Sequence, residues 1–167
     1  MSEDPQERAL KKAYRLLALR SHSGMELSAK LRTAGFAESV IAGTLARCRE
    51  LGYLDDGRFA RQRARELAVN RLLGDRRIAL DLREKGIPED LCREAIAAAR
   101  EELDAGEAIE RLLQKKLPAT VGAPGTDHRR QKERIIRGLL GKGFSQGLIF
   151  SKLKRTEEDG FHGDDGE

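Results

Sequence analysis

Arginine side chains gather between residues 58 and 77, and they are the groups in this chain whose type and spacing best suit a chemical task. Seven arginines stand there against two acidic residues. Arg58, Arg61 and Arg65 recur three and four positions apart, so on a helix they form one stripe. A guanidinium group binds phosphate or carboxylate through two parallel hydrogen bonds. The segment is therefore a candidate surface for an anionic partner, although a solvated helix face would show the same pattern.

A second basic cluster, His-Arg-Arg-Gln-Lys, occupies residues 128–132. It has the same two interpretations, a contact to phosphate or carboxylate and a solvated face. Together the two segments supply the candidate contact residues of the chain, which are Arg58, Arg61, Arg65, Arg76, Arg77, Arg129, Arg130 and Lys132.

Groups for catalysis or metal binding do not converge in the sequence. The three histidines are scattered, and neither His-x-x-His nor Cys-x-x-Cys occurs, so we expect no metal site. The glycine-rich stretch 122–126 lacks the Lys-Ser or Lys-Thr ending of a phosphate loop, and no strand precedes it, which favours a linker. Asp55 and Asp56 could be paired carboxylates, but a predicted helix start explains them as caps. We therefore expect neither an enzyme nor a cofactor.

The elements that must position these side chains follow from a pattern that occurs three times. Its landmark is a glycine followed by a large apolar residue, at Gly35, Gly86 and Gly143. Apolar residues stand eight and four positions before each glycine, and again five, six and ten positions after it. The earlier pair fits a stripe on one helix and the later three fit a stripe on the next. The pattern indicates a helix–turn–helix corner that is encoded three times.

The glycine of each corner fits the end of a helix. A residue at that position takes a left-handed conformation, which costs any residue with a Cβ atom a steric clash. In the Schellman ending, the residue after the glycine touches the residue four positions before it. The contacts expected on this basis are Phe36 on Leu31, Ile87 on Leu82 and Phe144 on Leu139.

A further helix is predicted before each corner, which gives three-helix repeats and an all-α fold. The limits set by helix-breaking residues are 1–54, 55–103 and 104–155, with a Pro/Gly loop at 117–126 inside the third repeat. Glycines within the predicted helices of the third repeat indicate that it is the least stable. Residues 156–167 are predicted to form an acidic, disordered tail.

Charge divides the chain into a basic body and an acidic end. All 32 basic residues lie before Thr156, with 22 of the 28 acidic ones, so the body carries a formal charge of +10. The last twelve residues hold six acids. A basic body predicts an anionic partner, such as nucleic acid or an acidic protein surface. Two widely spaced cysteines, a polar N-terminus and the lack of a long apolar stretch predict a cytoplasmic protein with no membrane partner.

A helix–turn–helix corner also suggests that the chain reads DNA sequence. The second helix of each corner would then enter the major groove. Its exposed positions, however, hold few of the Arg, Lys, Asn and Gln residues that contact base edges. In the second repeat these positions are acidic, with Glu89, Asp90 and Glu94. We therefore expect any direct DNA contact to be weak, made to the backbone and sensitive to salt.

Several segments resemble the RecX family, whose members regulate the RecA recombinase. The specific part is the box Ser23-Gly-Met-Glu-Leu27 followed by Asp55-Asp-Gly-Arg-Phe-Ala60, and the resemblance covers about residues 9–154. The glycine corners alone are weaker support, because many helical proteins contain such corners. The acidic residues at the C-terminal end are not part of the family pattern.

The resemblance implies an extended, curved array of three-helix repeats that lies in the groove of the RecA filament on single-stranded DNA. It implies modulation of the filament, usually inhibition of strand exchange and of the coupled ATP hydrolysis, with a role in DNA repair and the SOS response. It supplies no catalytic residue. We expect a monomer. The first alternative is a DNA-binding protein that acts without RecA, with salt-sensitive and non-specific contacts. A second alternative is a general helical adaptor for another partner.

Overall fold

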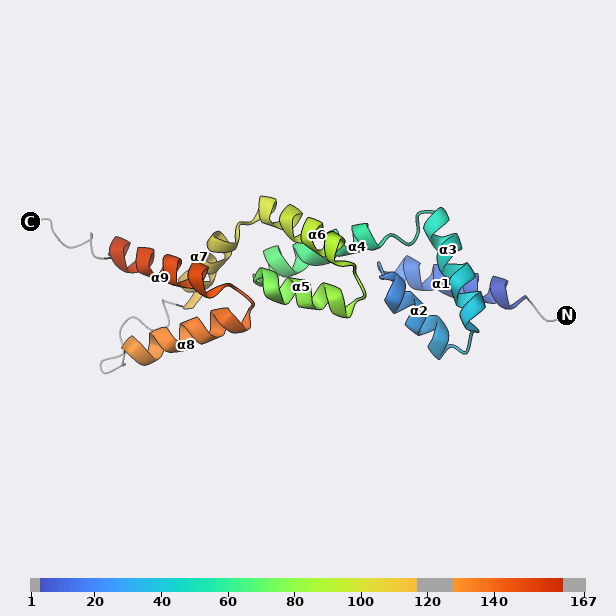
Figure 1. Ribbon diagram of the computed structural model, residues 1–167, viewed down its shortest axis with the longest axis horizontal. Helices are drawn as coiled ribbons and strands as arrows, with labels where there is room; N and C mark the ends of the chain where they lie inside the picture. The colour runs from blue at the N-terminus through green and yellow to red at the C-terminus, as the bar shows by residue number, and fades with distance from the viewer. Residues whose placement is uncertain (1–3, 117–127, 161–167) are drawn as a thin grey trace, which may run out of the picture. The chain divides into compact units, whose positions relative to one another are not determined.

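The computed structural model of the chain describes residues 4–116 and 128–160, and within them every regular element is a helix (Figure 1). The predicted all-α class is confirmed. None of these helices is long and apolar enough to cross a membrane. In chain order the helices are α1 (Pro5–Leu19), α2 (Gly24–Thr33), α3 (Glu38–Glu50), α4 (Asp56–Arg65) with a following π-helical turn (Glu66–Asn70), α5 (Asp75–Glu84), α6 (Glu89–Glu102), α7 (Ala105–Lys116), α8 (His128–Gly141) and α9 (Gln146–Gly160).

The three predicted corners are present, each with the hydrogen bond of a Schellman ending. The backbone angle φ is 87° at Gly35, 75° at Gly86 and 93° at Gly143, all in the left-handed region. The next residue donates its backbone N–H to the carbonyl five positions earlier, in the pairs Phe36–Leu31 (3.3 Å), Ile87–Leu82 (3.1 Å) and Phe144–Leu139 (3.3 Å). The pairing inferred from sequence spacing is thus confirmed.

The connection between α3 and α4 is fixed at both ends. Helix α3 finishes in a fourth ending of the same kind, where Gly52 has a φ of 73° and Tyr53 donates its N–H to the Cys48 carbonyl at 2.9 Å. Helix α4 then begins with the predicted cap, because the carboxylate of Asp55 accepts the N–H of Arg58 at 2.9 Å. Little freedom is left to the residues between.

Two compact units make up the described chain. The first contains the described residues up to Arg63 together with Asp81–Ala95, and the second contains Ala64–Leu80 and the described residues from Ile96 onward. Aliphatic side chains dominate both cores. In the first unit the central core residues are Ala13, Leu27, Leu31, Ile41, Cys48 and Leu54. In the second unit one core cluster of large buried side chains consists of Leu72, Leu103, Ile109, Leu112, Leu113, Leu139, Phe144, Ile149 and Leu153. This division is defined by contacts between residues and does not test where the repeats begin and end. The limits of the three predicted repeats therefore remain predictions.

Within the first unit, the corner at Gly86 lies against the start of α2. A Cβ atom on Gly86 would come within 2.7 Å of the Cβ of Met25. Beside this contact the ammonium of Lys85 lies 3.2 Å from the carboxylate of Glu26. Glu26 also completes the predicted capping box of α2 with Ser23. The corner is therefore held by close packing and by an ion pair.

In the second unit, the helical segment that follows α4 ends at a leucine and not at a glycine. Leu72 has a φ of 53°, in the left-handed region, and Leu73 donates its N–H to the Leu67 carbonyl at 2.9 Å across the π-helical turn. The left-handed conformation costs a residue with a side chain about 1–2 kcal/mol. The side chain of Leu72 is only 5% exposed and belongs to the core of the second unit, so its burial offsets that cost.

Helix α9 runs to Gly160, so the prediction of disorder from Thr156 onward is wrong for residues 156–160. Lys, Arg and Glu occupy four of the five positions 154–158, and all three residue types are strong helix formers. The acidic composition of the segment predicted disorder, but these helix propensities prevail up to residue 160. The predicted loop at 117–126 and residues 161–167 of the tail lie outside the described residues.

Candidate functional site

The arginines of α4 lie on its exposed face, as their spacing predicts. Arg58, Arg61 and Arg65 are exposed, whereas Phe59 and Ala60 between them are buried. The first unit holds Arg58 and Arg61, and the second unit holds Arg65. The three guanidinium groups have different surroundings within their units.

In the first unit, Arg58 is tied to the connection that precedes α4. Its guanidinium donates to the Gly52 carbonyl at 2.5 Å, and its backbone N–H donates to the carboxylate of Asp55. This backbone hydrogen bond lowers the pKa of Asp55. Arg61 makes no hydrogen bond or ion pair with any residue that the structure describes. Its guanidinium is accordingly available to an external anion.

In the second unit, Arg65 is engaged by a carboxylate. Its Nε and Nη2 donate to the two oxygens of Glu102, both at 2.6 Å, and these hydrogen bonds raise the pKa of Arg65. The two side chains are 56% and 44% exposed, and ion pairs with such access to water add little stability. A phosphate that approached Arg65 would have to compete with Glu102.

The second unit brings Arg76 and Arg77 next to a cation that sequence reasoning missed. Both arginines lie exposed in the first turn of α5. The N–H of Arg76 donates to the Gly143 carbonyl (3.2 Å), and the N–H of Gly74 donates to the Lys142 carbonyl (2.8 Å). The corner after α8 thus lies against the start of α5, which brings the backbone of Lys142 to the segment that carries the two arginines. These residues are far apart in the chain, so no local pattern could have grouped them.

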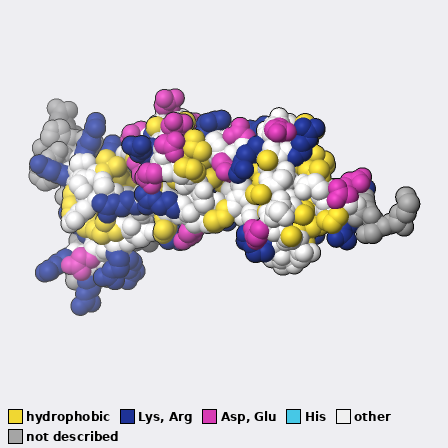
Figure 2. Space-filling view, turned by 45° about the vertical axis from the view of Figure 1, so that its right-hand side comes forward, with side chains coloured by type: hydrophobic (Ala, Val, Ile, Leu, Met, Phe, Trp, Pro, Cys, Tyr) yellow, Lys and Arg dark blue, Asp and Glu magenta, His cyan; other side chains and the backbone are white. Residues whose placement is uncertain are grey.

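Helix α8 carries five Lys and Arg residues against one acidic residue. The predicted cluster forms its first turns, where Arg129 and Arg130 are exposed and Lys132 is half-buried. Arg129 Nε lies 3.2 Å from a carboxylate oxygen of Glu133, one turn further along. Figure 2 shows Lys and Arg side chains projecting from the part of the surface where α8 lies, with a small acidic patch among them.

Two further arginines extend this basic surface along α8. Arg134 and Arg137 are exposed and form no hydrogen bond or ion pair with the described residues. With Arg130 they recur four and three positions apart, so they share one face of the helix. The spacing of these arginines in the sequence is a signal from which this face could have been predicted.

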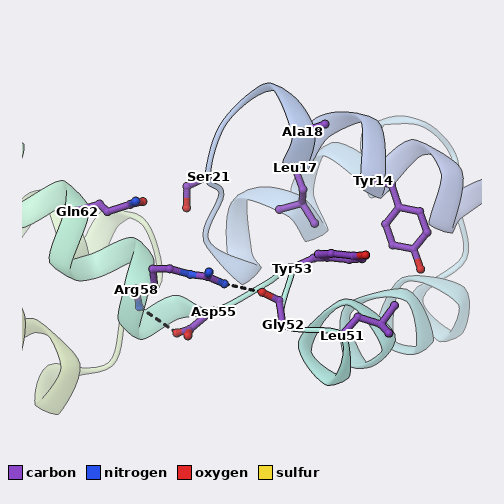
Figure 3. A pocket seen from close by; sticks show the side chains of 10 residues that line it. All are labelled: Tyr14, Leu17, Ala18, Ser21, Leu51, Gly52, Tyr53, Asp55, Arg58 and Gln62. Carbon is purple, nitrogen blue, oxygen red and sulfur yellow. Dashed lines mark hydrogen bonds between the residues drawn. The ribbon is translucent and has the colours of Figure 1, made fainter.

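The first unit also contains a pocket, which sequence reasoning did not predict. Its volume is about 620 Å³. One wall comes from α1 and the residues just after it, a second from the connection between α3 and α4, and a third from α4 itself (Figure 3). The lining mixes aromatic, aliphatic, neutral polar and charged side chains, from Tyr14, Leu17, Ala18, Ser21, Leu51, Gly52, Tyr53, Asp55, Arg58 and Gln62.

Three titratable side chains outside these surfaces are buried in the folded protein. Cys48 and Cys92 are free, buried thiols, and burial raises the pKa of both. The ring of buried His22 lies 2.9 Å from the Arg20 carbonyl and 3.0 Å from the Lys30 ammonium. Among the described residues no three His, Cys, Asp or Glu side chains lie close enough together to hold a metal ion.

The chain matches family models for three successive domains. The first three-helix domain of RecX matches residues 9–48, the second three-helix domain matches 55–96, and the third matches 104–153. Each match lies inside one of the predicted repeats.

Curated relatives and solved structures agree with these matches. The Regulatory protein RecX of Syntrophotalea carbinolica is 35% identical over 87% of this chain and 94% of that protein. The Regulatory protein RecX of Thermus thermophilus is 34% identical over 91% of this chain and 94% of its own length. The crystal structure of RecX from Lactobacillus salivarius has the same fold, with a TM-score of 0.81 at 22% identity, over 92% of this chain and 97% of that one.

Proposed function

The chain belongs to the RecX family, and from that premise we propose that it regulates the RecA recombinase. In this proposal the protein binds the RecA filament on single-stranded DNA and inhibits strand exchange and the coupled hydrolysis of ATP. It acts as a monomer in the cytoplasm, in DNA repair and the SOS response, and performs no catalysis of its own.

The observation that carries the proposal is the presence of exposed cationic groups in both compact units. The first unit offers Arg61, and the second offers Arg76, Arg77 and the basic face of α8. A filament presents the same anionic groups again and again, so several modest contacts reinforce one another through their effective concentration. Tandem helical repeats suit such a partner, because they present many short contact surfaces in place of one deep cleft.

We propose that the α4 arginines, together with Arg76 and Arg77, contact the anionic groove of the filament. Arg61 can bind an anion at once, whereas Arg65 must first exchange Glu102 for the new partner. Reversing the charge at both Arg61 and Arg65 should weaken filament binding and leave helicity unchanged. Reversal at both Arg32 and Arg47 is a matched control, since both are exposed arginines of the first unit that pair with Glu38 and Glu50. Equal effects of the two sets would remove the α4 arginines from the proposal.

The decisive measurement is binding to single-stranded DNA with and without a RecA filament assembled on it, at near-physiological salt. The rate of ATP hydrolysis by the filament is followed in the same samples. Tight binding only to the filament, with slower hydrolysis, is the expected result. Equal binding to bare DNA with unchanged hydrolysis would overturn the proposal.

The second candidate is a non-specific DNA-binding protein that acts without RecA. The basic face of α8 favours it, because guanidinium groups on an exposed helix are suited to phosphates of any sequence. The same measurement separates the two candidates, since only this one predicts binding that is indifferent to RecA.

A further inference from the structure

We propose that the pocket of the first unit binds an unstacked base of single-stranded nucleic acid, with the ring of Tyr53 as the stacking surface and Arg58 as the contact to the adjoining phosphate. This goes beyond the proposed filament contact, because it concerns a direct contact between this chain and a base. It also differs from backbone binding by the basic surfaces, which needs no base.

Tyr53 is presented to solvent on a fixed support. Its side chain is 57% exposed, although aromatic side chains usually serve the core. The rings of Tyr14 and Tyr53 form a T-shaped pair, with ring centroids 5.5 Å apart and planes at 79°. The backbone of Tyr53 is held by the ending of α3 at Gly52. A flat ring with only two side-chain torsions can accept a base at a small entropic cost.

Arg58 lies within reach of the sugar–phosphate backbone that a stacked base would carry. Its guanidinium donates to the carbonyl of Gly52, the residue directly before Tyr53 (Figure 3). A guanidinium has five N–H donors, so this one bond leaves others for a phosphate. Aromatic and arginine side chains placed together are the means by which many proteins hold single strands.

The rest of the pocket suits the edge of a base. Leu17 and Leu51 supply apolar wall, while Ser21 and Gln62 supply neutral donors and acceptors. Base edges carry both donors and acceptors, so this mixture can meet more than one base. The volume of about 620 Å³ lies within the range of small-molecule sites, which leaves room for one nucleotide and its water.

The rival occupant is an apolar side chain of a protein partner. Charge at the pocket favours nucleic acid, because Arg58 lines it and Arg61 stands one turn later with no ion pair among the described residues, and together they outweigh the carboxylate of Asp55. Arg61 is placed to meet a second phosphate of the same strand. A nucleotide would contact the ring of Tyr53 and both arginines at once, whereas an apolar side chain of a protein partner would use neither guanidinium group.

The chain offers a direct optical test, because it contains two tyrosines and no tryptophan, and both tyrosines line the pocket. In the Tyr14→Phe variant, Tyr53 is the sole source of tyrosine emission. This variant is titrated with oligothymidylate and with an abasic oligonucleotide of equal length, while the anisotropy of a dye on the oligonucleotide reports binding. We expect oligothymidylate to quench the emission and the abasic strand to bind without quenching.

Substitutions then test the affinity. Tyr53→Ala should weaken binding of oligothymidylate about 5- to 150-fold, the range of one lost base stack, while Tyr53→Phe keeps most of the affinity. Binding of the abasic strand should not respond to either change, and Arg47→Gln serves as a control outside the pocket, with circular dichroism confirming helicity.

Unchanged emission while oligothymidylate is bound, or full affinity in Tyr53→Ala, would overturn the proposal. Emission that responds to a RecA filament but not to bare oligothymidylate would assign the pocket to protein instead. Neither result depends on filament ATP hydrolysis, so failure of the pocket and failure of the proposed regulation are distinguishable.

Discussion

Gly74 and Gly143 lie so close together that a Cβ atom on Gly74 would stand 2.2 Å from the carbonyl carbon of Gly143. A Cβ on Gly143 would in turn come within 2.4 Å of the backbone nitrogen of Arg77. Backbone atoms cannot turn aside as a flexible side chain can. The corner after α8 and the start of α5 therefore fit together only because both contact residues are glycines.

Alanine at either position should destabilise the protein. For Gly74→Ala we expect a loss of roughly 1–3 kcal/mol in the free energy of unfolding, the usual cost of overpacking. Gly143→Ala should lose about 1–2 kcal/mol more, because its φ of 93° adds strain. Urea denaturation measures both. Gly141→Ala is the matched control, since open space surrounds that glycine in α8 and the change should stabilise by up to about 1 kcal/mol. Equal effects at all three positions would contradict the close contact.

Leu72 should reverse the usual order of alanine and glycine. Removing its buried side chain costs about 2–5 kcal/mol in either variant. Glycine, however, relieves the left-handed strain that alanine retains, so Leu72→Gly should be more stable than Leu72→Ala by about 1 kcal/mol. At buried Leu67, whose φ is not positive, the ordinary order should hold and glycine should be worse. Thermal unfolding of the four variants tests this, and the same order at both sites would contradict it.

Stability should fall in acid as Glu26 takes up a proton. Burial opposes ionisation of Glu26, but hydrogen bonds from Arg20, Lys85 and the Ser23 N–H outweigh it and hold the pKa at about 2, against 4.5 in the unfolded chain. The fold thus favours the ionised form, and its contribution is complete above pH 4.5 and lost as the pH falls from 4.5 to about 2.

The variant Glu26→Gln isolates this contribution. Hydrogen bonds to a charged group add about 1.5–3 kcal/mol, so the variant should be less stable by that amount at neutral pH. The difference in free energy of unfolding between variant and parent should shrink as the pH drops below 4.5. A difference that is independent of pH would show that the charge of Glu26 is not what stabilises the corner.

Arg134 and Arg137 should reveal themselves in the salt dependence of DNA binding. If each contacts one phosphate of a single strand, replacing both with alanine should make the slope of log K against log salt shallower by about 1.4. Replacing Arg32 and Arg47, which pair with Glu38 and Glu50 in the first unit, should leave the slope unchanged. Loss of affinity without a change in slope would point to an altered fold of α8.

The features that were predicted correctly from the sequence depend on residues that are close together in the chain. Each corner depends on residues within a few positions of one glycine, so spacing alone identified Gly35, Gly86 and Gly143. The exposure of the α4 arginines followed from helical periodicity. Contacts between distant segments could not be predicted from local sequence, and they include the approach of Lys142 to Gly74 and the pairing of Tyr14 with Tyr53 that shapes the pocket. The left-handed conformation of Leu72 was not predicted for another reason. Nothing in the neighbouring sequence indicates that a leucine takes this conformation.

The corners at Gly86 and Gly143 pack against different kinds of atoms. The corner at Gly86 touches the side chain of Met25, whereas the corner at Gly143 touches mainly the backbone of Arg77. In the first unit, a substitution of the facing residue, Met25, should therefore change the stability of the fold. In the second unit the facing side chain takes little part in it. Positions 76 and 77 can therefore diverge between descendants of this chain without harming its architecture, which would let selection tune the strength of the proposed contact to a partner at little structural cost.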